Sequence, residues 1–194
     1  MSATRLLVLG VVRVRGEAHG YQVRRDLRSW AADSWANVQP GSVYHALKKL
    51  ARDGLLTDAG TAEPAAGPER AVYRITPDGE TEFFALLAEA LSRPDRGVDG
   101  LSAGVTFLTT LPRADAVALL NHRLVALEGD LASAKHMVDT WSTMGKPEHV
   151  TELARLWSIA GEGDIRWTRD LVARLEDGAY VMADDGAGFG HPPT

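Results

Sequence analysis

Residues 39–56 read QPGSVYHALKKLARDGLL, and this stretch predicts a short helix with a marked start and a marked end. The start is a cluster of proline, glycine and serine, in which the Ser42 hydroxyl can accept a hydrogen bond from an unpaired backbone N–H. The end is Gly54, because glycine readily adopts the left-handed conformation that closes many helices. We therefore expect one helix between these two signals.

The predicted helix has an apolar back and a polar front. Val43, Leu47 and Leu50 recur at the three-to-four spacing of one helical stripe, which indicates a buried side. The front carries hydroxyl, imidazole and basic groups from Ser42, His45, Lys48, Lys49 and Arg52. Such a front suits the major groove of DNA, although a solvated surface helix has the same composition. The neighbouring elements favour the DNA interpretation.

Those neighbouring elements predict a winged helix-turn-helix. Helices are expected before the stretch at residues 4–14 and about 19–32, with a turn at residues 16–18 between them. Strands are expected after it at residues 55–60 and 71–76, joined by a loop rich in alanine, glycine and proline. In a winged helix the third helix enters the major groove and this loop lies along the flanking backbone. The predicted fold class is mainly α with a small two-stranded wing.

The second half of the chain predicts a separate helical region. Thr76 and the proline after it start a linker helix that runs to about Ser92. Residues 93–100 are rich in proline, glycine and aspartate, which indicates a domain boundary. Helices are then expected at residues 101–111, 112–141 and 147–176. The expected domains are a winged helix with its linker helix at 1–92, a helical dimerisation or effector domain at 93–178, and a flexible tail at 179–194.

An apolar seam runs along the predicted helix at residues 112–141. Its apolar residues alternate steps of three and four, a pattern that requires a partner helix. The candidate dimerisation residues are Val117, Leu120, Leu124, Leu127, Leu131 and Val138. Packing within one chain produces the same pattern, so the seam leaves a dimer and an intramolecular bundle open.

The residue inventory argues against an enzyme or a metal protein. The absence of cysteine excludes disulfides, thiolate metal sites and cysteine nucleophiles. The six histidines form no H-E-x-x-H pair, and neither a G-x-S-x-G motif nor a phosphate-binding loop occurs. No catalytic residue, metal or cofactor is therefore expected. The apolar run from Leu6 to Val12 is too short to span a bilayer, so we expect a cytoplasmic protein.

The charge is unevenly distributed along the chain. The net charge is −5, yet residues 1–53 contain nine Lys and Arg against four Asp and Glu. That first part therefore carries +5 and the rest carries −10. Such a gradient is a hint that the N-terminal part faces nucleic acid.

Three motifs occur in order along the first half of the chain. They are HGY at residues 19–21, GSVYHALKKL at residues 41–50 followed by GL at 54–55, and YRITPDG at residues 73–79. With these motifs, residues 1–92 resemble the PadR-type transcriptional regulators, which have an N-terminal winged helix and a helical C-terminal dimerisation region. The resemblance implies a homodimeric, ligand-responsive repressor that binds a palindromic operator. The C-terminal hundred residues match that family only in architecture.

Candidate DNA contacts follow from what each side chain can do. They are Tyr21, Arg28, Ser42, Tyr44, His45, Lys48, Lys49 and Arg70. The basic groups would neutralise phosphates, and the helix start at Ser42 is a natural phosphate site. The two tyrosine hydroxyls could donate to the backbone, and His45 or a lysine could reach base edges.

Each of these roles has a plainer alternative. Tyr21 and Tyr44 could fill space between the first three helices, and Arg28 could belong to a solvated face. The wing departs from the family pattern, because Glu63 and Glu69 stand where a basic cluster is usual. A winged helix used for protein–protein contact, without DNA binding, is the alternative function.

The helical region also carries candidate effector residues. They are Trp141, Trp157, Asp164 and Trp167. Tryptophans beside a lone carboxylate in an apolar stripe could hold a small aromatic effector, and the resemblance to regulators that respond to phenolic acids or drugs favours this. Core packing of the tryptophans is the alternative, and Asp164 could instead pair with Arg123 or His122.

Overall fold

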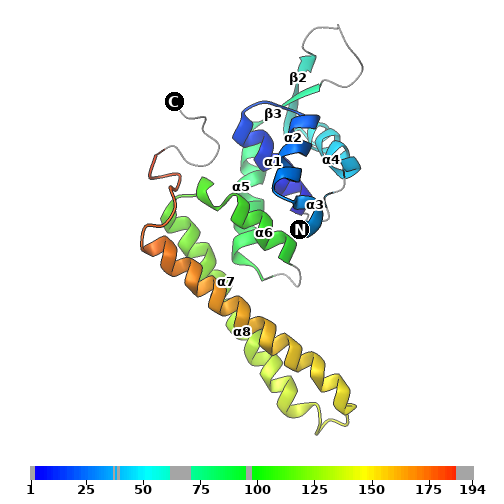
Figure 1. Ribbon diagram of the computed structural model, residues 1–194, viewed down its shortest axis with the longest axis vertical. Helices are drawn as coiled ribbons and strands as arrows, with labels where there is room; N and C mark the ends of the chain where they lie inside the picture. The colour runs from blue at the N-terminus through cyan, green and yellow to red at the C-terminus, as the bar shows by residue number, and fades with distance from the viewer. Residues whose placement is uncertain (1–2, 37, 39, 62–70, 95–97, 187–194) are drawn as a thin grey trace. The chain divides into compact units, whose positions relative to one another are not determined.

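The computed structural model describes residues 3–36, 38, 40–61, 71–94 and 98–186. The chain divides into two compact units, whose elements are labelled in Figure 1. The first unit comprises Met1–Leu91, Asp95–Pro112 and Val181–Thr194, and the second comprises Ser92–Pro94 and Arg113–Tyr180.

The first unit is a winged helix, as the sequence predicts. Its helices are α1 (Ala3–Arg15), α2 (Gly20–Ser29), α3 (Ala32–Trp35), α4 (Pro40–Arg52), α5 (Pro77–Ser92), whose last residue lies in the second unit, and α6 (Val98–Thr106), followed by a 3₁₀ turn at Leu108–Thr110. Its strands are β1 (Ala18–His19), β2 (Leu56–Thr61) and β3 (Ala71–Ile75), which form an antiparallel sheet in the order β1-β3-β2. Ala18 pairs with Tyr73 and Leu56 pairs with Ile75. The mainly α fold class is therefore confirmed.

The core of this unit is built on α1. Every residue from Leu6 to Val12 is buried, which explains why the run is so uniformly apolar. Phe107, at the end of α6, lies against α1 at Gly10, where a Cβ atom would meet its ring at 2.3 Å. Phe107 also makes edge contacts with Trp30 at 6.0 Å and with Phe83 at 5.5 Å between ring centroids. The aromatic cluster thus joins α1, α2, α5 and α6.

Local details differ from the expectations in three places. The expected turn at residues 16–18 ends in strand β1, which is too short to leave a periodic signal. Ala31 adopts a left-handed φ of 54°, so the second helix stops before it and the short α3 follows. Helix α4 begins at Pro40, which places Ser42 in its first turn rather than at its N-cap. Gly54 does close α4, with a φ of +76°.

The boundary between the two units also differs from the expected one near residue 92. Helix α6 and the 3₁₀ turn pack with the winged helix, because Phe107 is buried against α1. The expected tail includes a packed segment, in which Met182 is fully buried and Ala183 donates a backbone hydrogen bond to Leu111 at 3.2 Å. Residues 187–194 of the expected tail lie outside the described residues.

The second unit is an antiparallel hairpin of two long helices, α7 (Arg113–Thr140) and α8 (Glu148–Glu176), which lie side by side in Figure 1. Arg113 closes the open end of the hairpin. Its Nη1 donates to the carbonyls of Leu175 and Ala179, both at 2.8 Å, and its Nη2 donates to Tyr180 at 3.0 Å. Among the described residues, no helix is long and apolar enough to cross a membrane.

The apolar residues of α8 that follow the spacing of one helical stripe are Val150, Leu153, Trp157, Ala160, Trp167 and Leu171. Most of this stripe is not the buried side of the helix. The buried residues are mostly one position later and are small along the first half of the helix: Thr151, Ala154, Ser158, Ile165, Thr168, Leu171, Val172 and Leu175. Small side chains let two helices approach closely, so the bulkier residues of the helix are left toward solvent.

Candidate nucleic-acid interface

Helix α4 has the two faces that its sequence predicts. Val43, Leu47 and Leu50 are each 1% exposed and form its buried back. His45 and Lys48 are exposed on the opposite side. Lys49 and Arg52 are also exposed, and Ser42 is half-buried. The helix therefore offers a cationic front on a fixed apolar support.

The lysines of this front are available to an outside partner. Across the described part of the chain, no carboxylate forms an ion pair with Lys48, Lys49 or Arg28. Cations that are already paired with carboxylates gain less from a phosphate, because the first partner must be displaced. These three side chains do not carry that cost.

The two candidate tyrosines lie in different environments. The ring of Tyr44 lies against α2 at Gly20, where a Cβ atom would meet its Cε1 at 2.6 Å. Tyr44 is half-buried, so it packs α4 onto α2 as the plainer alternative supposed. Tyr21 is 63% exposed, an unusual exposure for so large a side chain. Tyr21 is therefore the tyrosine whose hydroxyl can meet a partner.

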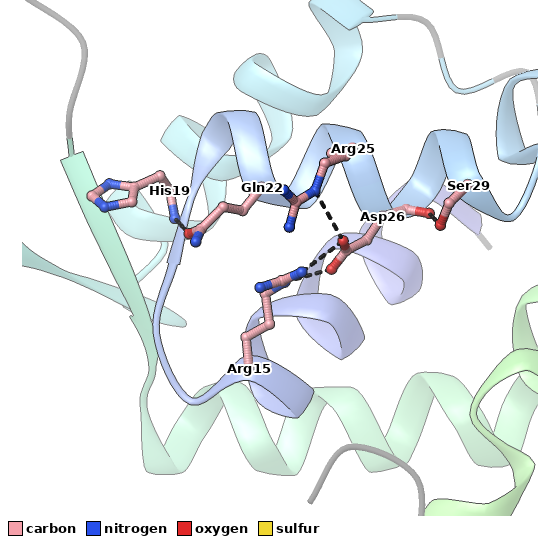
Figure 2. A network of polar contacts seen from close by, with 6 residues as sticks. All are labelled: Arg15, His19, Gln22, Arg25, Asp26 and Ser29. Atoms are coloured by element: carbon pink, nitrogen blue, oxygen red, sulfur yellow. Dashed lines mark hydrogen bonds and ion pairs between the residues drawn. The ribbon is translucent and has the colours of Figure 1, made fainter. Parts of the chain in front are cut away.

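Helix α2 is fixed to α1 by a polar network that Figure 2 shows. Arg15, from the end of α1, donates both Nε and Nη2 to the carboxylate of Asp26, the latter at 2.7 Å. The hydrogen bond to Asp26 raises the pKa of Arg15, so this guanidinium stays charged. Gln22 accepts a hydrogen bond from the backbone N–H of His19 at 2.8 Å and so caps the start of α2. The exposed Arg28 is carried on this fixed helix.

An open hollow of about 270 Å³ lies beside the α4 front, where α1 begins. It is lined by Thr4, Arg5, Ser42, His45, Ala46, Lys49 and Leu50. Arg5 is paired with Glu82 at 2.8 Å and with Asp53 at 3.3 Å, so it links α1 to α5 and to the end of α4. The sequence analysis missed Thr4 and Arg5 as neighbours of the front, because only the direction of α1 in space brings them there.

A tight junction ties α4 to α5. The Thr76 hydroxyl donates to the carbonyl of Gly54 at 2.8 Å and accepts from the backbone N–H of Gly79 at 3.0 Å. Thr76 is therefore the predicted cap of α5. A Cβ atom at Gly79 would lie 2.1 Å from the carbonyl oxygen of Leu55. The start of α5 is therefore in close contact with the residues that follow α4.

The described part of the wing is its two strands, β2 and β3. Arg70 lies outside the described residues, as do Glu63 and Glu69. The role of Arg70 in binding DNA stays a prediction from the sequence.

The candidate dimerisation residues of α7 lie in and beside the hairpin contact. Leu120 and Leu127 are 0% and 4% exposed and pack against α8 within the chain. Val117, Leu124, Leu131 and Val138 are half-buried. Burial within the chain therefore accounts for Leu120 and Leu127, and a dimer contact through the other four residues stays a prediction.

A different apolar surface is left open on α8. Its large exposed residues are Leu153, Leu156, Trp157, Ile159 and Trp167. Leu156 and Ile159 are 59% and 70% exposed. An exposed cluster of large apolar side chains is typical of a surface that binds a partner. One feature of the sequence indicates this surface. Along the first half of α8, a stripe of bulky residues stands next to a stripe of small ones, and only one of these two stripes can face α7.

The candidate effector residues do not meet around one cavity. Trp141 and Trp157 make an edge contact with ring centroids 6.1 Å apart. Asp164 pairs with Arg123 at 3.9 Å, which is one of the two partners considered for it. Trp167 is ten residues beyond Trp157 on α8, or about 15 Å along the helix. A groove of about 610 Å³ between α7 and α8 is lined by other residues, among them the ion pair of Lys135 and Glu162.

Comparisons with solved structures give distant similarities. The chain is similar to Bacillus subtilis PadR in complex with operator DNA, with 20% identity, 90% of this chain and 98% of that chain covered, and a TM-score of 0.42. It is similar to the same protein in complex with p-coumaric acid, with 18% identity, coverage of 90% and 99%, and a TM-score of 0.38. It is also similar to smu.1604c from Streptococcus mutans UA159, with 20% identity, coverage of 90% and 96%, and a TM-score of 0.39.

Sequence comparison gives a family-model match over the winged helix. A comparison with curated protein sequences finds no match. The family model of the transcriptional regulator PadR-like family matches residues 8–85, which run from α1 through the α4 front into α5. The winged helix is therefore similar to the PadR-like family of transcriptional regulators over these residues.

Proposed function

We propose that the protein is a homodimeric transcriptional repressor that inserts α4 into the major groove of a palindromic operator. One observation carries this proposal: α4 combines a fully buried apolar back with an exposed front whose two lysines have no ion pair among the described residues. Tyr21 of α2, which is 63% exposed, adds a second kind of group that can meet a partner.

The roles of the contacts follow from their places. Lys48, Lys49 and Arg28 neutralise phosphates and supply most of the affinity. His45, in the middle of the exposed front, reaches base edges and supplies sequence preference. The Tyr21 hydroxyl donates to the backbone from the start of α2. Ser42 and the first backbone N–H groups of α4 approach a phosphate, and Arg70 of the wing adds another contact.

The second copy binds through the outer face of α8. Ala160 is seven residues from Leu153 and seven from Trp167, so two antiparallel copies that cross at Ala160 bring Trp167 against the partner's Leu153. Such a contact is self-complementary, as a twofold interface must be. It covers the exposed large residues of α8 that the chain itself leaves open. Two copies of α4 then read two half-sites, which gives an operator protein its affinity.

The DNA-binding part is tested by measuring affinity for duplex DNA against salt concentration. The duplex is one selected from a random pool by the full-length protein. Lys48→Ala combined with Lys49→Ala should weaken binding and lower the salt slope by about 2, or about 1 for each lysine that neutralises a phosphate. The matched control is Lys135→Ala with Lys146→Ala, which removes two lysines from the hairpin. An equal loss of affinity in both variants, or none in the first, contradicts the assignment to α4.

The dimer is tested separately by sedimentation. Leu153→Glu with Leu156→Glu places two charges in the proposed interface, and the protein should become monomeric. Val125→Glu is the control, because Val125 is 71% exposed on α7 and outside the α8 stripe. A wild-type protein that is monomeric at micromolar concentration contradicts the dimer.

The effector is the last part of the proposal. We place a small aromatic acid beside the Trp141–Trp157 pair, where an indole edge is partly exposed. Tryptophan fluorescence is measured during titration with a panel of planar aromatic carboxylic acids. Quenching that is lost in Trp157→Phe and kept in Trp35→Phe supports this site. Unchanged fluorescence across the panel removes the effector from the proposal.

A further inference from the structure

Arg123 is the one charged side chain that is almost completely buried within the described parts of the chain. It is 2% exposed and lies on α7, on the side that packs against α8. Its Nη1 donates to the carbonyl oxygen of Arg93 at 2.9 Å, and its Nε has no hydrogen-bond partner among the described residues. Burying a charge costs free energy unless the charge is paired, so the neighbours of Arg123 indicate its role.

A carboxylate on the second helix of the hairpin faces this guanidinium. The Oδ2 atom of Asp164 lies 3.9 Å from Nη2 of Arg123, and the Asp164 side chain is 51% exposed. Burial lowers the pKa of Arg123, and the charge of Asp164 acts in the opposite direction. Asp164 thus offsets part of the free-energy cost of burying Arg123.

The group that Arg123 binds is the end of the linker helix. Helix α5 ends at Ser92, and the last carbonyls of a helix have no partner within it. Arg123 donates a hydrogen bond to the carbonyl of Arg93, and Nδ1 of His122 lies 3.4 Å from the carbonyl oxygen of Ser92. Two consecutive residues of α7 therefore lie against the carbonyls of the last residue of α5 and of the residue after it.

The other end of α5 is tied to α4, through Thr76 and the close approach of Gly79 to Leu55. Arg5 adds a second tie, because it joins Glu82 of α5 to Asp53 at the end of α4. The contacts with α4 and the contacts with Arg123 and His122 therefore lie at opposite ends of α5.

We propose that Arg123, oriented by Asp164, is a positioning residue that fixes the end of α5 on the hairpin and thereby sets the spacing at which two copies of α4 meet DNA. This inference rests on the proposed function for its consequence on DNA. Its first step, the holding of the linker, does not depend on DNA. A methionine of similar length could fill the same space, but it has no donor for the Arg93 carbonyl.

The first experiment measures the holding of the linker without DNA. The chain has no cysteine, so spin labels go specifically on Ala85→Cys in α5 and Ala173→Cys in α8, both exposed positions. The full-length labelled protein is diluted with unlabelled protein, and the distribution of label-to-label distances is recorded. Arg123→Met should broaden this distribution while the helical circular dichroism is kept. A distribution as narrow as that of the wild type overturns the proposal.

Variants at Asp164 separate positioning from simple packing. Asp164→Asn removes the charge at a half-exposed site with little change of shape, so it should fold and still broaden the distribution. Asp164→Glu keeps the carboxylate and should restore the narrow distribution. Arg155→Met is the control for loss of an exposed arginine from α8. Equal distributions for Asp164→Asn and Asp164→Glu overturn the role given to the carboxylate.

The second experiment reads the consequence on DNA. The selected duplex is compared with duplexes in which one, two or five base pairs are inserted between the half-sites, and with a single half-site. Arg123→Met and Asp164→Asn should keep their half-site affinity. Their preference for the selected spacing should fall by roughly 5–150-fold, the range of typical coupling free energies. Wild-type preference in both variants overturns the spacing role. Absence of DNA binding by the wild type overturns the proposed function, and the distance measurement still decides whether the linker is held.

Discussion

Gly79→Ala tests the junction between α4 and α5. Gly79 is buried in the first turn of α5, and a Cβ atom there would lie 2.1 Å from the carbonyl oxygen of Leu55. Ordinary contact begins at 3.4 Å, so the two backbones must separate by 1.3 Å, the difference between these two distances. The oxygen cannot turn away freely, because it accepts the backbone N–H of Thr76 at 3.1 Å.

The size of the effect follows from two opposing contributions. Overpacking costs about 1–3 kcal/mol, and the upper end applies because the obstacle is backbone rather than a flexible side chain. Replacing glycine by alanine in a helix contributes about 1 kcal/mol of stabilisation. We therefore expect Gly79→Ala to lower the free energy of unfolding of the winged helix by about 2 kcal/mol.

The assay is urea unfolding followed by circular dichroism. Gly41→Ala is the matched control, since Gly41 lies in α4 of the same unit and a Cβ atom there meets nothing within 4 Å. This control should leave the stability unchanged or raise it by up to about 1 kcal/mol. If Gly79→Ala is as stable as Gly41→Ala, the close contact between α5 and Leu55 is wrong.

Other substitutions test the remaining parts of the structure. Gly10→Ala should destabilise the winged helix by about 1–3 kcal/mol in urea unfolding, because its Cβ would enter the ring of Phe107. Tyr21→Phe should weaken DNA binding by about 1 kcal/mol in a titration, whereas Tyr44→Phe should not, since the Tyr44 ring packs within the protein. Arg113→Met should lower the free energy of unfolding of the hairpin by roughly 2 kcal/mol in thermal unfolding, because three carbonyls lose their charged donor.

The winged helix could be predicted because its local signals agree with its tertiary contacts. The left-handed Gly54 ends α4 where the sequence places the end, and the Thr76 hydroxyl caps α5 as its position before proline indicates. The buried residues of α4 are those that its spacing selects, among them Leu47. Strand β1 has two residues and was missed, because its pairing with Tyr73 is decided by a partner more than fifty residues away.

The helical hairpin shows where sequence patterns stop being sufficient. The larger apolar residues of α8 form a stripe containing Leu153 and Trp157, yet the buried side of the helix has the smaller Ala154 and Ser158 beside them. Close helix packing rewards small side chains, and no count of apolar residues detects that. Arg123 lies on the buried side of α7 between Leu120 and Leu127, and only the placement of the linker carbonyl next to it explains its burial.

The central claim is that two copies of the chain present two α4 fronts to one duplex. Native mass spectrometry of the wild-type protein on its selected duplex, combined with hydroxyl-radical footprinting of the same complex, tests it most directly. We predict two chains per duplex and two protected segments whose centres lie about one helical turn, or a small multiple of it, apart. A complex with one chain, or a footprint with a single protected segment, would contradict the account.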